Sequence, residues 1–135
     1  MVDSECATFI EEVMNMVTLY GYPPCSTCKK AEKWLKENDV EYTYVHIVEA
    51  TPSKDELAEL WKQSGLPLKK FFNTSGQVYR NEGIKDQLPN LSEDEQLELL
   101  ASNGMLLKRP IVTDGQKSTV GFSEKSFTDV WGEVL

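Results

Sequence analysis

VTLYGYPPCSTCKKA, residues 17–31, decides the fold, because a short β-prone run turns into a helix here at a pair of cysteines. The run 17–20 is followed by a turn rich in glycine and proline. Residues 29–38 then show the apolar spacing of an amphipathic helix. The sequence therefore predicts a strand and a helix that are joined at Cys25.

The cysteine pair predicts a redox site. Cys25 falls at the helix N-terminus, where free backbone N–H groups and the helix dipole favour a thiolate and lower its pKa. Cys28 follows about one helical turn later, close enough to Cys25 to form a disulfide. Zinc would need about four ligands, whereas the chain has three cysteines, one histidine and no second Cys-x-x-Cys pair. Two unreactive structural cysteines are the alternative, although the flanking prolines and lysines fit an exposed thiolate better.

Composition indicates a small globular protein. The 135 residues are 40% hydrophobic, and no apolar run approaches the roughly 18 residues of a membrane span. Residues 1–15 are acidic and lack the pattern of a signal peptide, which predicts a cytoplasmic protein. The net charge of −8 opposes direct binding to nucleic acid. We therefore expect a monomer that binds a protein or a small oxidant, without contact with nucleic acid or membrane.

The rest of the chain predicts a second strand, a helical stretch, a hairpin and a last helix. The run EYTYVHIV, residues 41–48, is aromatic and β-branched and predicts the second strand. Capping boxes at Ser53 and Ser92 predict helices that end at Gly65 and Gly104. The other expected elements are short helical turns over 66–90, a hairpin over 109–113 and 118–120, and a helix capped by Ser123.

This order of elements is the plan of the thioredoxin fold, an α/β fold with a mixed sheet. We expect one thioredoxin-like domain over 16–135 (βαβ…ββα), with a helical insertion over about 52–104. Residues 1–15 are interpreted as an N-terminal arm that need not be ordered, and Cys6 within it has no evident partner. His46, in the second strand, is interpreted as an ordinary strand residue.

Two motifs resemble the arsenate reductase (ArsC)/Spx family, a branch of the thioredoxin superfamily with a helical insertion. They are PCSTCKKA over 24–31 and KRPIV over 108–112. The stretches LKKFFNTSG and SEDEQLELLASNGMLLKRP are similar to the small YusI-like bacterial members of the family. The resemblance covers about residues 16–131, and its specificity lies in the combination of motifs.

The resemblance implies roles for four residues. Cys25 is the expected nucleophile, and Cys28 is its expected disulfide partner, as in Spx-type members. Pro110 is expected to follow a cis peptide bond and to shape the groove that faces the cysteine loop. Arg109 matches an arginine that holds the oxyanion in arsenate reductases, and its charge would lower the pKa of Cys25. A surface ion pair is the alternative role for Arg109.

Departures from the arsenate reductase pattern predict weak binding of arsenate. Lys69 stands where those enzymes have an arginine, and lysine keeps the charge without the bidentate fork. Gly121 stands where they have a further arginine. Lys29, Lys69 and Arg109 would still supply positive potential. Cys28, which those reductases usually lack, would act as an internal resolving thiol.

Spx represents the other branch of the family, a transcription regulator that binds the α subunit of RNA polymerase and uses its cysteine pair as a redox switch. Gly65 lies near the position of the polymerase-contacting glycine, and residues 121–124 resemble Spx. The chain ends soon after Trp131 without the basic tail of Spx, which favours an enzyme over a regulator.

We therefore predict a cytoplasmic thiol–disulfide oxidoreductase. Cys25 attacks a disulfide or another oxidised acceptor, and Cys28 then displaces the product and leaves an intramolecular disulfide. Glutathione or thioredoxin is the expected reductant, and we expect no bound cofactor. The alternatives are a Spx-like regulator that binds the RNA polymerase α subunit and a glutathione- or thioredoxin-dependent arsenate reductase.

Overall fold

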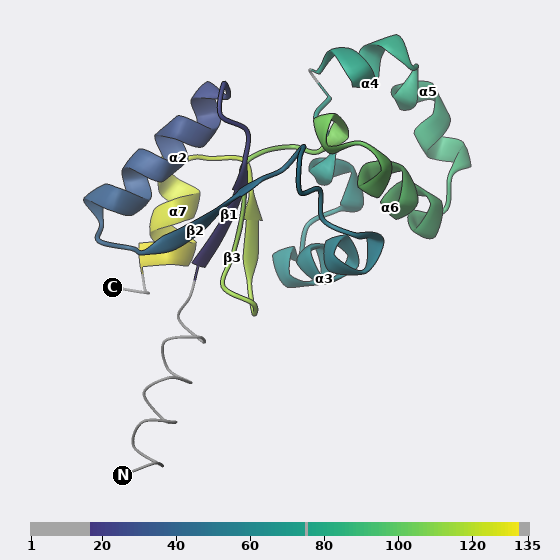
Figure 1. The fold of residues 1–135 in the computed structure, drawn as a ribbon. Helices are drawn as coiled ribbons and strands as arrows, with labels where there is room; N and C mark the ends of the chain where they lie inside the picture. The colour runs from purple at the N-terminus through teal and green to yellow at the C-terminus, as the bar shows by residue number, and fades with distance from the viewer. Residues whose placement is uncertain (1–16, 75, 133–135) are drawn as a thin grey trace.

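The structure is a computed structural model that describes residues 17–74 and 76–132 (Figure 1). The expected N-terminal arm over 1–15, with Cys6, lies outside the described residues, and so does Met16, the first residue of the expected domain. Within the part of the chain that is described, no helix is long and apolar enough to cross a membrane.

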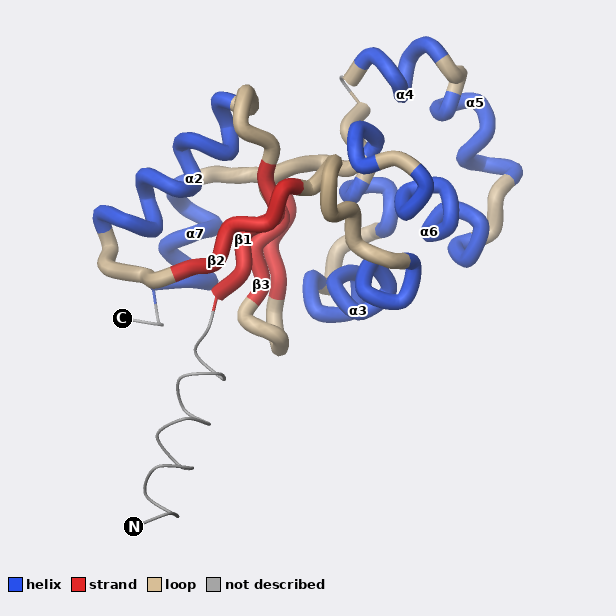
Figure 2. The backbone as a smooth tube through the Cα atoms, in the orientation of Figure 1, coloured by secondary structure: helices blue, strands red, loops and turns tan. Residues whose placement is uncertain are grey.

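A mixed sheet of four strands lies at the centre of the fold (Figure 2). Its strands and flanking helices are β1 (Val17–Gly21), α2 (Ser26–Glu37), β2 (Tyr42–His46), β3 (Ile111–Thr113), β4 (Ser118–Val120) and α7 (Glu124–Trp131). The strand order is β2-β1-β3-β4, in which β1 and β2 are parallel and the other pairs are antiparallel. Since parallel neighbours need a crossover, α2 connects β1 to β2, whereas a tight turn connects β3 to β4. The predicted α/β, thioredoxin-like arrangement is confirmed.

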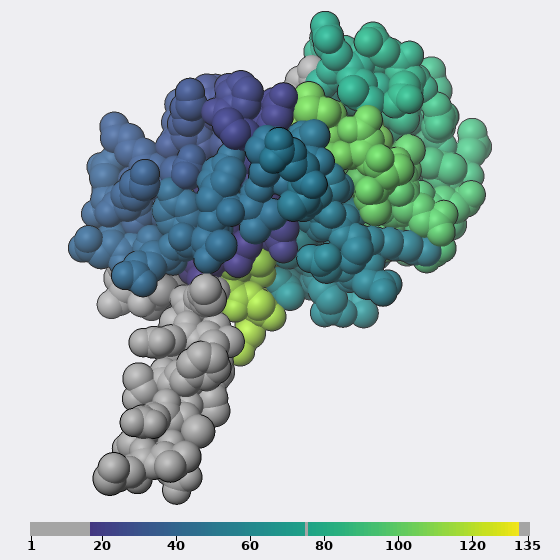
Figure 3. Space-filling model, viewed as in Figure 1, coloured from purple at the N-terminus to yellow at the C-terminus, as the bar shows by residue number. Residues whose placement is uncertain are grey.

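The chain between β2 and β3 forms a helical block beside the sheet (Figure 1), and its teal and green atoms gather on the right of the space-filling view (Figure 3). Its elements are α3 (Lys54–Ser64), η1 (Leu68–Phe71), α4 (Gln77–Asn81), α5 (Ile84–Gln87), η2 (Leu88–Asn90), α6 (Glu93–Ser102) and η3 (Gly104–Leu106). Both predicted capping boxes are present, at Ser53 with Glu56 and at Ser92 with Glu95. Gly65 ends α3 in the left-handed conformation, with φ of 67°, as predicted.

Gly104 does not end α6, contrary to the prediction. Asn103 caps the helix in an extended conformation, and Gly104 begins η3. A Cβ atom at Gly104 would collide with the carbonyl oxygen of Ile47, which directly follows β2. Gly104 is therefore required for the close approach of the helical block to the end of β2. Glycine is needed at this position because of a contact with a distant segment, and not because a helix ends there.

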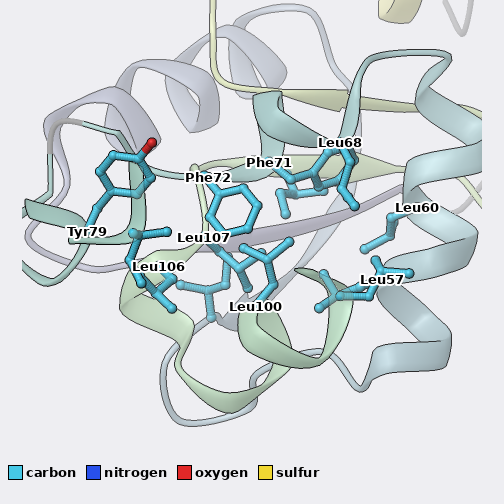
Figure 4. Close-up of a cluster of buried hydrophobic side chains, with 13 residues drawn as sticks. Leu57, Leu60, Leu68, Phe71, Phe72, Tyr79, Leu100, Leu106 and Leu107 are labelled. Atoms are coloured by element: carbon cyan, nitrogen blue, oxygen red, sulfur yellow. The ribbon is translucent and has the colours of Figure 1, made fainter. Parts of the chain in front are cut away.

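The two faces of the sheet carry separate hydrophobic cores, because successive strand side chains point to opposite faces. Leu19 and Val112 pack with α2 and α7 on one face, whereas Tyr20 and Ile111 pack with the helical block on the other. Figure 1 shows α2 and α7 together on one side of the sheet and α3 to α6 on the other. Phe71 and Phe72 pack the block together (Figure 4).

The close approach at Gly104 gives a test of the fold. Gly104→Ala should lower the free energy of unfolding by about 1–3 kcal/mol, because the Ile47 carbonyl would have to move. Gly132→Ala is the matched control, since Gly132 has φ of −62° and its added Cβ would make an ordinary 3.8 Å contact with Thr128. Urea unfolding midpoints compare the two variants, and equal midpoints would contradict a required close approach.

Candidate active site

Cys25 is the N-cap of α2, as the sequence predicts. The helix begins at Ser26, earlier than the expected start at residue 29, because the cysteine itself caps it. Its Sγ accepts a hydrogen bond from the backbone N–H of Cys28 at 3.4 Å. The backbone N–H of Cys25 donates to the Tyr22 carbonyl at 2.9 Å, which closes the turn after β1. The thiol is thus held where α2 presents its free N–H groups.

The two cysteines differ in exposure. Both are free thiols; Cys25 is half-buried, whereas Cys28 is buried, with 1% of its surface exposed. A substrate can therefore reach Cys25 first. Cys28 lies on the buried face of α2, where it continues the apolar spacing of Ala31 and Leu35. This arrangement suits a nucleophile with a second thiol behind it.

The pKa values of the two thiols shift in opposite directions. Burial by itself raises the pKa of Cys25, but hydrogen bonds from Cys28 and from the N–H of Thr27, together with the charge of Arg109, lower it overall. Burial, and then the hydrogen bond to Cys25, raise the pKa of Cys28 to about 12. A lower pKa means more thiolate at neutral pH, so the structure favours ionisation of Cys25 over ionisation of Cys28.

Arg109 lies beside the cysteine loop without a carboxylate partner. Its guanidinium carbon is 5.0 Å from the centroid of the Tyr22 ring, a cation–π contact. Nη1 donates to the Leu107 carbonyl over a long 3.5 Å, and the buried Nε has no hydrogen-bond partner among the described residues. Because no ion pair of Arg109 occurs within the described chain, the surface ion-pair alternative is not supported. Its charge is free to act on the thiols.

Pro110 is buried directly before β3, and the Arg109–Pro110 peptide bond is cis, as the resemblance implied. Its carbonyl accepts the N–H of Gly121 at 2.8 Å, so the end of β4 supports this segment. The structure therefore brings Arg109, directly before Pro110, close enough to Cys25 and Cys28 for its charge to act on both thiols.

The two predicted lysines lie at the surface. Lys29 is exposed on α2, and Lys69 is exposed on η1. Among the described residues, Arg109 is the positive charge that contributes to the pKa shifts of both cysteines. The roles of Lys29 and Lys69 in positive potential stay predictions.

Sequence reasoning missed two tyrosines beside the site. Tyr22 lies between Arg109 on its face and the ring of His46, whose centroid is 5.5 Å away in an edge-to-face arrangement. The hydroxyl of Tyr44 lies 3.1 Å from the position that a Cβ of Gly21 would occupy. Burial, followed by the charges of Cys28, Glu32 and Cys25, raises the pKa of Tyr44. The signal for Tyr44 was the alternation of residues along β2, the strand that pairs with β1.

His46 is the last residue of β2 and has a local structural role. Its Nδ1 accepts the backbone N–H groups of Val48 and Glu49, at 3.3 Å and 3.1 Å, and so fixes the turn after the strand. Within the described chain, no three His, Cys, Asp or Glu side chains are grouped so that they could hold a metal ion.

Comparison with known proteins adds independent information. The family model of the ArsC family matches residues 20–130. The uncharacterized protein YusI of Bacillus subtilis is 58% identical over 115 residues, which cover 85% of this chain and 98% of YusI. The global transcriptional regulator Spx of Streptococcus mutans is 32% identical over 109 residues, 81% of this chain and 78% of Spx. A crystal structure of a possible arsenate reductase from Streptococcus mutans is 43% identical with a TM-score of 0.76, covering 83% of this chain and 97% of that one.

The charge of Arg109 predicts the pH dependence of alkylation. Cys25 should react with iodoacetamide with an apparent pKa below that of a free thiol, and Arg109→Gln should raise this pKa because a thiolate loses a nearby positive charge. Arg80→Gln, at an exposed position on α4, is the control and should leave the profile unchanged. Alkylation rates measured against pH decide the matter; identical profiles for both variants would remove Arg109 from the site.

Proposed function

We propose that this chain, which belongs to the ArsC family, is a cytoplasmic thiol–disulfide oxidoreductase with Cys25 as nucleophile and Cys28 as resolving thiol. The observation that carries the proposal is the division between the two cysteines. Cys25 is half-exposed at the N-terminus of α2 with a lowered pKa, and Cys28 is buried one turn away with a raised one. A pair of unreactive structural cysteines would not account for this difference in exposure and pKa.

The reaction consists of two thiol–disulfide exchanges. The Cys25 thiolate attacks one sulfur of a substrate disulfide, the S–S bond breaks, and the second substrate sulfur leaves as a thiolate that takes up a proton. Cys28 then loses its proton and attacks the Cys25 sulfur, which releases the first substrate sulfur as a thiol. The substrate gains two electrons, and the protein is left with a Cys25–Cys28 disulfide. Glutathione or thioredoxin would return the two electrons.

The mixed disulfide itself would activate Cys28. In the free protein, the hydrogen bond to Cys25 and the negative charge of its thiolate both help to raise the pKa of Cys28. Both effects vanish once the Cys25 sulfur is bonded to the substrate. The N–H of Tyr22 and the charge of Arg109, which lower the pKa of Cys28, stay in place. The Cys28 thiol would therefore ionise more readily once the mixed disulfide, which it attacks, has formed.

A redox-switched transcription regulator is the second candidate function, favoured by the 32% identity to Spx. A Cys25–Cys28 disulfide would then change binding to the RNA polymerase α subunit. Gly65, near the expected polymerase contact, is exposed, but its φ of 67° at the end of α3 is a sufficient local reason for glycine. Sustained exchange separates the two functions, since a switch needs the disulfide and no turnover.

Arsenate reduction is a narrower alternative. Lys69 lies exposed on η1, and Gly121, where a further arginine was expected in arsenate reductases, is buried with φ of 80°. Cε of Lys108 is 3.5 Å from the position of a Cβ at Gly121, so a lysine from another segment covers this site. Arg109 is then the one arginine of that pattern left to bind the oxyanion, which supports a disulfide substrate over arsenate.

Trapping tests the order of the two cysteines. In a Cys6→Ser background, Cys28→Ser should stop after the first step and retain one bound glutathione after treatment with glutathione disulfide, whereas Cys25→Ser should bind none. The reason is that Cys28 is buried and scarcely ionised near neutral pH. Mass spectrometry of the intact protein measures the adduct. Full turnover by Cys28→Ser with glutathione would replace the dithiol mechanism with a monothiol one.

The reduction potential tests the dithiol site directly. The same Cys6→Ser protein, equilibrated in glutathione redox buffers, should show a defined Cys25–Cys28 couple between roughly −180 and −270 mV, the range of known exchange catalysts. Thiol trapping of the two redox forms measures the couple. Failure to form the disulfide at any potential would rule out both the oxidoreductase and the switch.

A further inference from the structure

The acidic residues of this chain avoid three segments. None of the 22 acidic residues lies in segments 17–31, 60–81 or 99–113, although the net charge is −8. The first segment holds the cysteine loop, the second holds η1, and the third leads into Pro110. Basic residues occur in all three. The segments are far apart in sequence, so an acid-free surface forms only where the fold joins them.

The fold joins the second and third segments by backbone contacts. Lys108 donates its N–H to the Phe71 carbonyl at 2.8 Å, and Phe72 forms an isolated antiparallel bridge with Leu107. Figure 4 shows Phe71, Phe72 and Leu107 packed together in one cluster. Because Lys69 and Lys70 directly precede Phe71, the backbone of the η1 lysines lies next to that of the Lys108–Arg109 pair.

The first segment is joined through Tyr22. This side chain packs against the cluster that contains Phe71 and Phe72, and its ring carries the guanidinium of Arg109 at 5.0 Å. The backbone carbonyl of Tyr22 also accepts a hydrogen bond from the backbone N–H of Cys25. One chain of contacts therefore leads from η1 through Tyr22 to the nucleophile.

We call Lys69, Lys70, Lys108 and Arg109 the basic patch; these four cations lie in two adjoining segments, and the charge of Arg109 acts on Cys25. Lys69 and Lys70 are exposed, and the other two are half-buried. In the described part of the chain, none of the four forms an ion pair. Lys54, by contrast, forms two ion pairs, since its Nζ lies 2.7 Å from Asp94 Oδ1 and 3.2 Å from Glu98 Oε1. Cations left unpaired in an acidic protein are available to bind a negatively charged partner.

We propose that the basic patch selects protein disulfides whose cysteine is flanked by acidic residues, by docking the acidic segment beside Cys25. This inference rests on the proposed oxidoreductase function and names its substrate class. A peptide chain suits the patch, because η1 and the Lys108–Arg109 pair are separate segments that a flexible acidic stretch can contact together. Opposite charge next to a reacting group accelerates encounter and fixes the register of the partner.

The basic patch and the net charge of the whole protein predict opposite effects on the rate of reaction with acidic peptides. A net charge of −8 repels an acidic substrate, so the whole-protein charge predicts slower reaction with acidic peptides. Fields from exposed charges fade over about 10 Å at 0.1 M salt, so the patch dominates close to Cys25. A preference for acidic peptides can therefore come only from local charge.

The test compares two peptide disulfides that differ only in the residues beside cysteine, Glu in one and Gln in the other. With reduced Cys6→Ser protein at about 0.1 M ionic strength, where the net charge of the whole protein is screened, the Glu peptide should react about tenfold faster. High ionic strength should remove the difference. The rate constants come from stopped-flow or quenched reactions with mass-spectrometric detection.

Matched double variants assign the effect to the patch. Lys69→Gln with Lys70→Gln should bring the Glu/Gln rate ratio close to one. Lys36→Gln with Lys85→Gln removes the same charge from exposed positions on α2 and α5, outside the three segments, and should leave the ratio unchanged.

Two results would overturn the proposal: a Glu/Gln ratio of one or less in the unmodified protein, or an equal loss of preference in both double variants. Absence of reaction with either peptide would instead contradict the proposed oxidoreductase function, so the two failures are distinguishable.

Discussion

The hydrogen bond from the Cys28 N–H to Cys25 Sγ is the contact on which the site depends. This bond caps α2. Because the N-cap residue also ends the turn that follows β1, the same contact fixes the position of the thiol relative to β1. The bond also favours the thiolate over the thiol. Structure and reactivity therefore share one interaction, and the spacing of the two cysteines follows from it.

The helical block completes the site although it contributes neither cysteine. Its contacts with Leu107 and Lys108 hold the segment that leads to Pro110, and Tyr22 packs on the same cluster. Arg109 lies between these parts, with its Nε buried and without a partner among the described residues. A buried guanidinium atom without a hydrogen bond is unfavourable in a resting fold.

Local patterns in the sequence were sufficient for much of this structure. The capping boxes at Ser53 and Ser92 and the N-cap position of Cys25 involve residues three apart, so their signals lie within one helical turn. The contact of Arg109 with Tyr22 and the approach of Gly104 to Ile47 join distant segments, which local patterns do not encode.

The same distinction applies to electrostatics. The net charge of −8 is a property of the sequence, and by itself it argues against anionic partners. Function depends on the field near Cys25, and this field is set by which segments the fold brings there. Arg109 is the cation that lowers the pKa of both thiols, and the fold, not the composition, brings it to them. A protein can thus be acidic overall and still present a reactive thiol in positive surroundings, and folding is the step that separates the two.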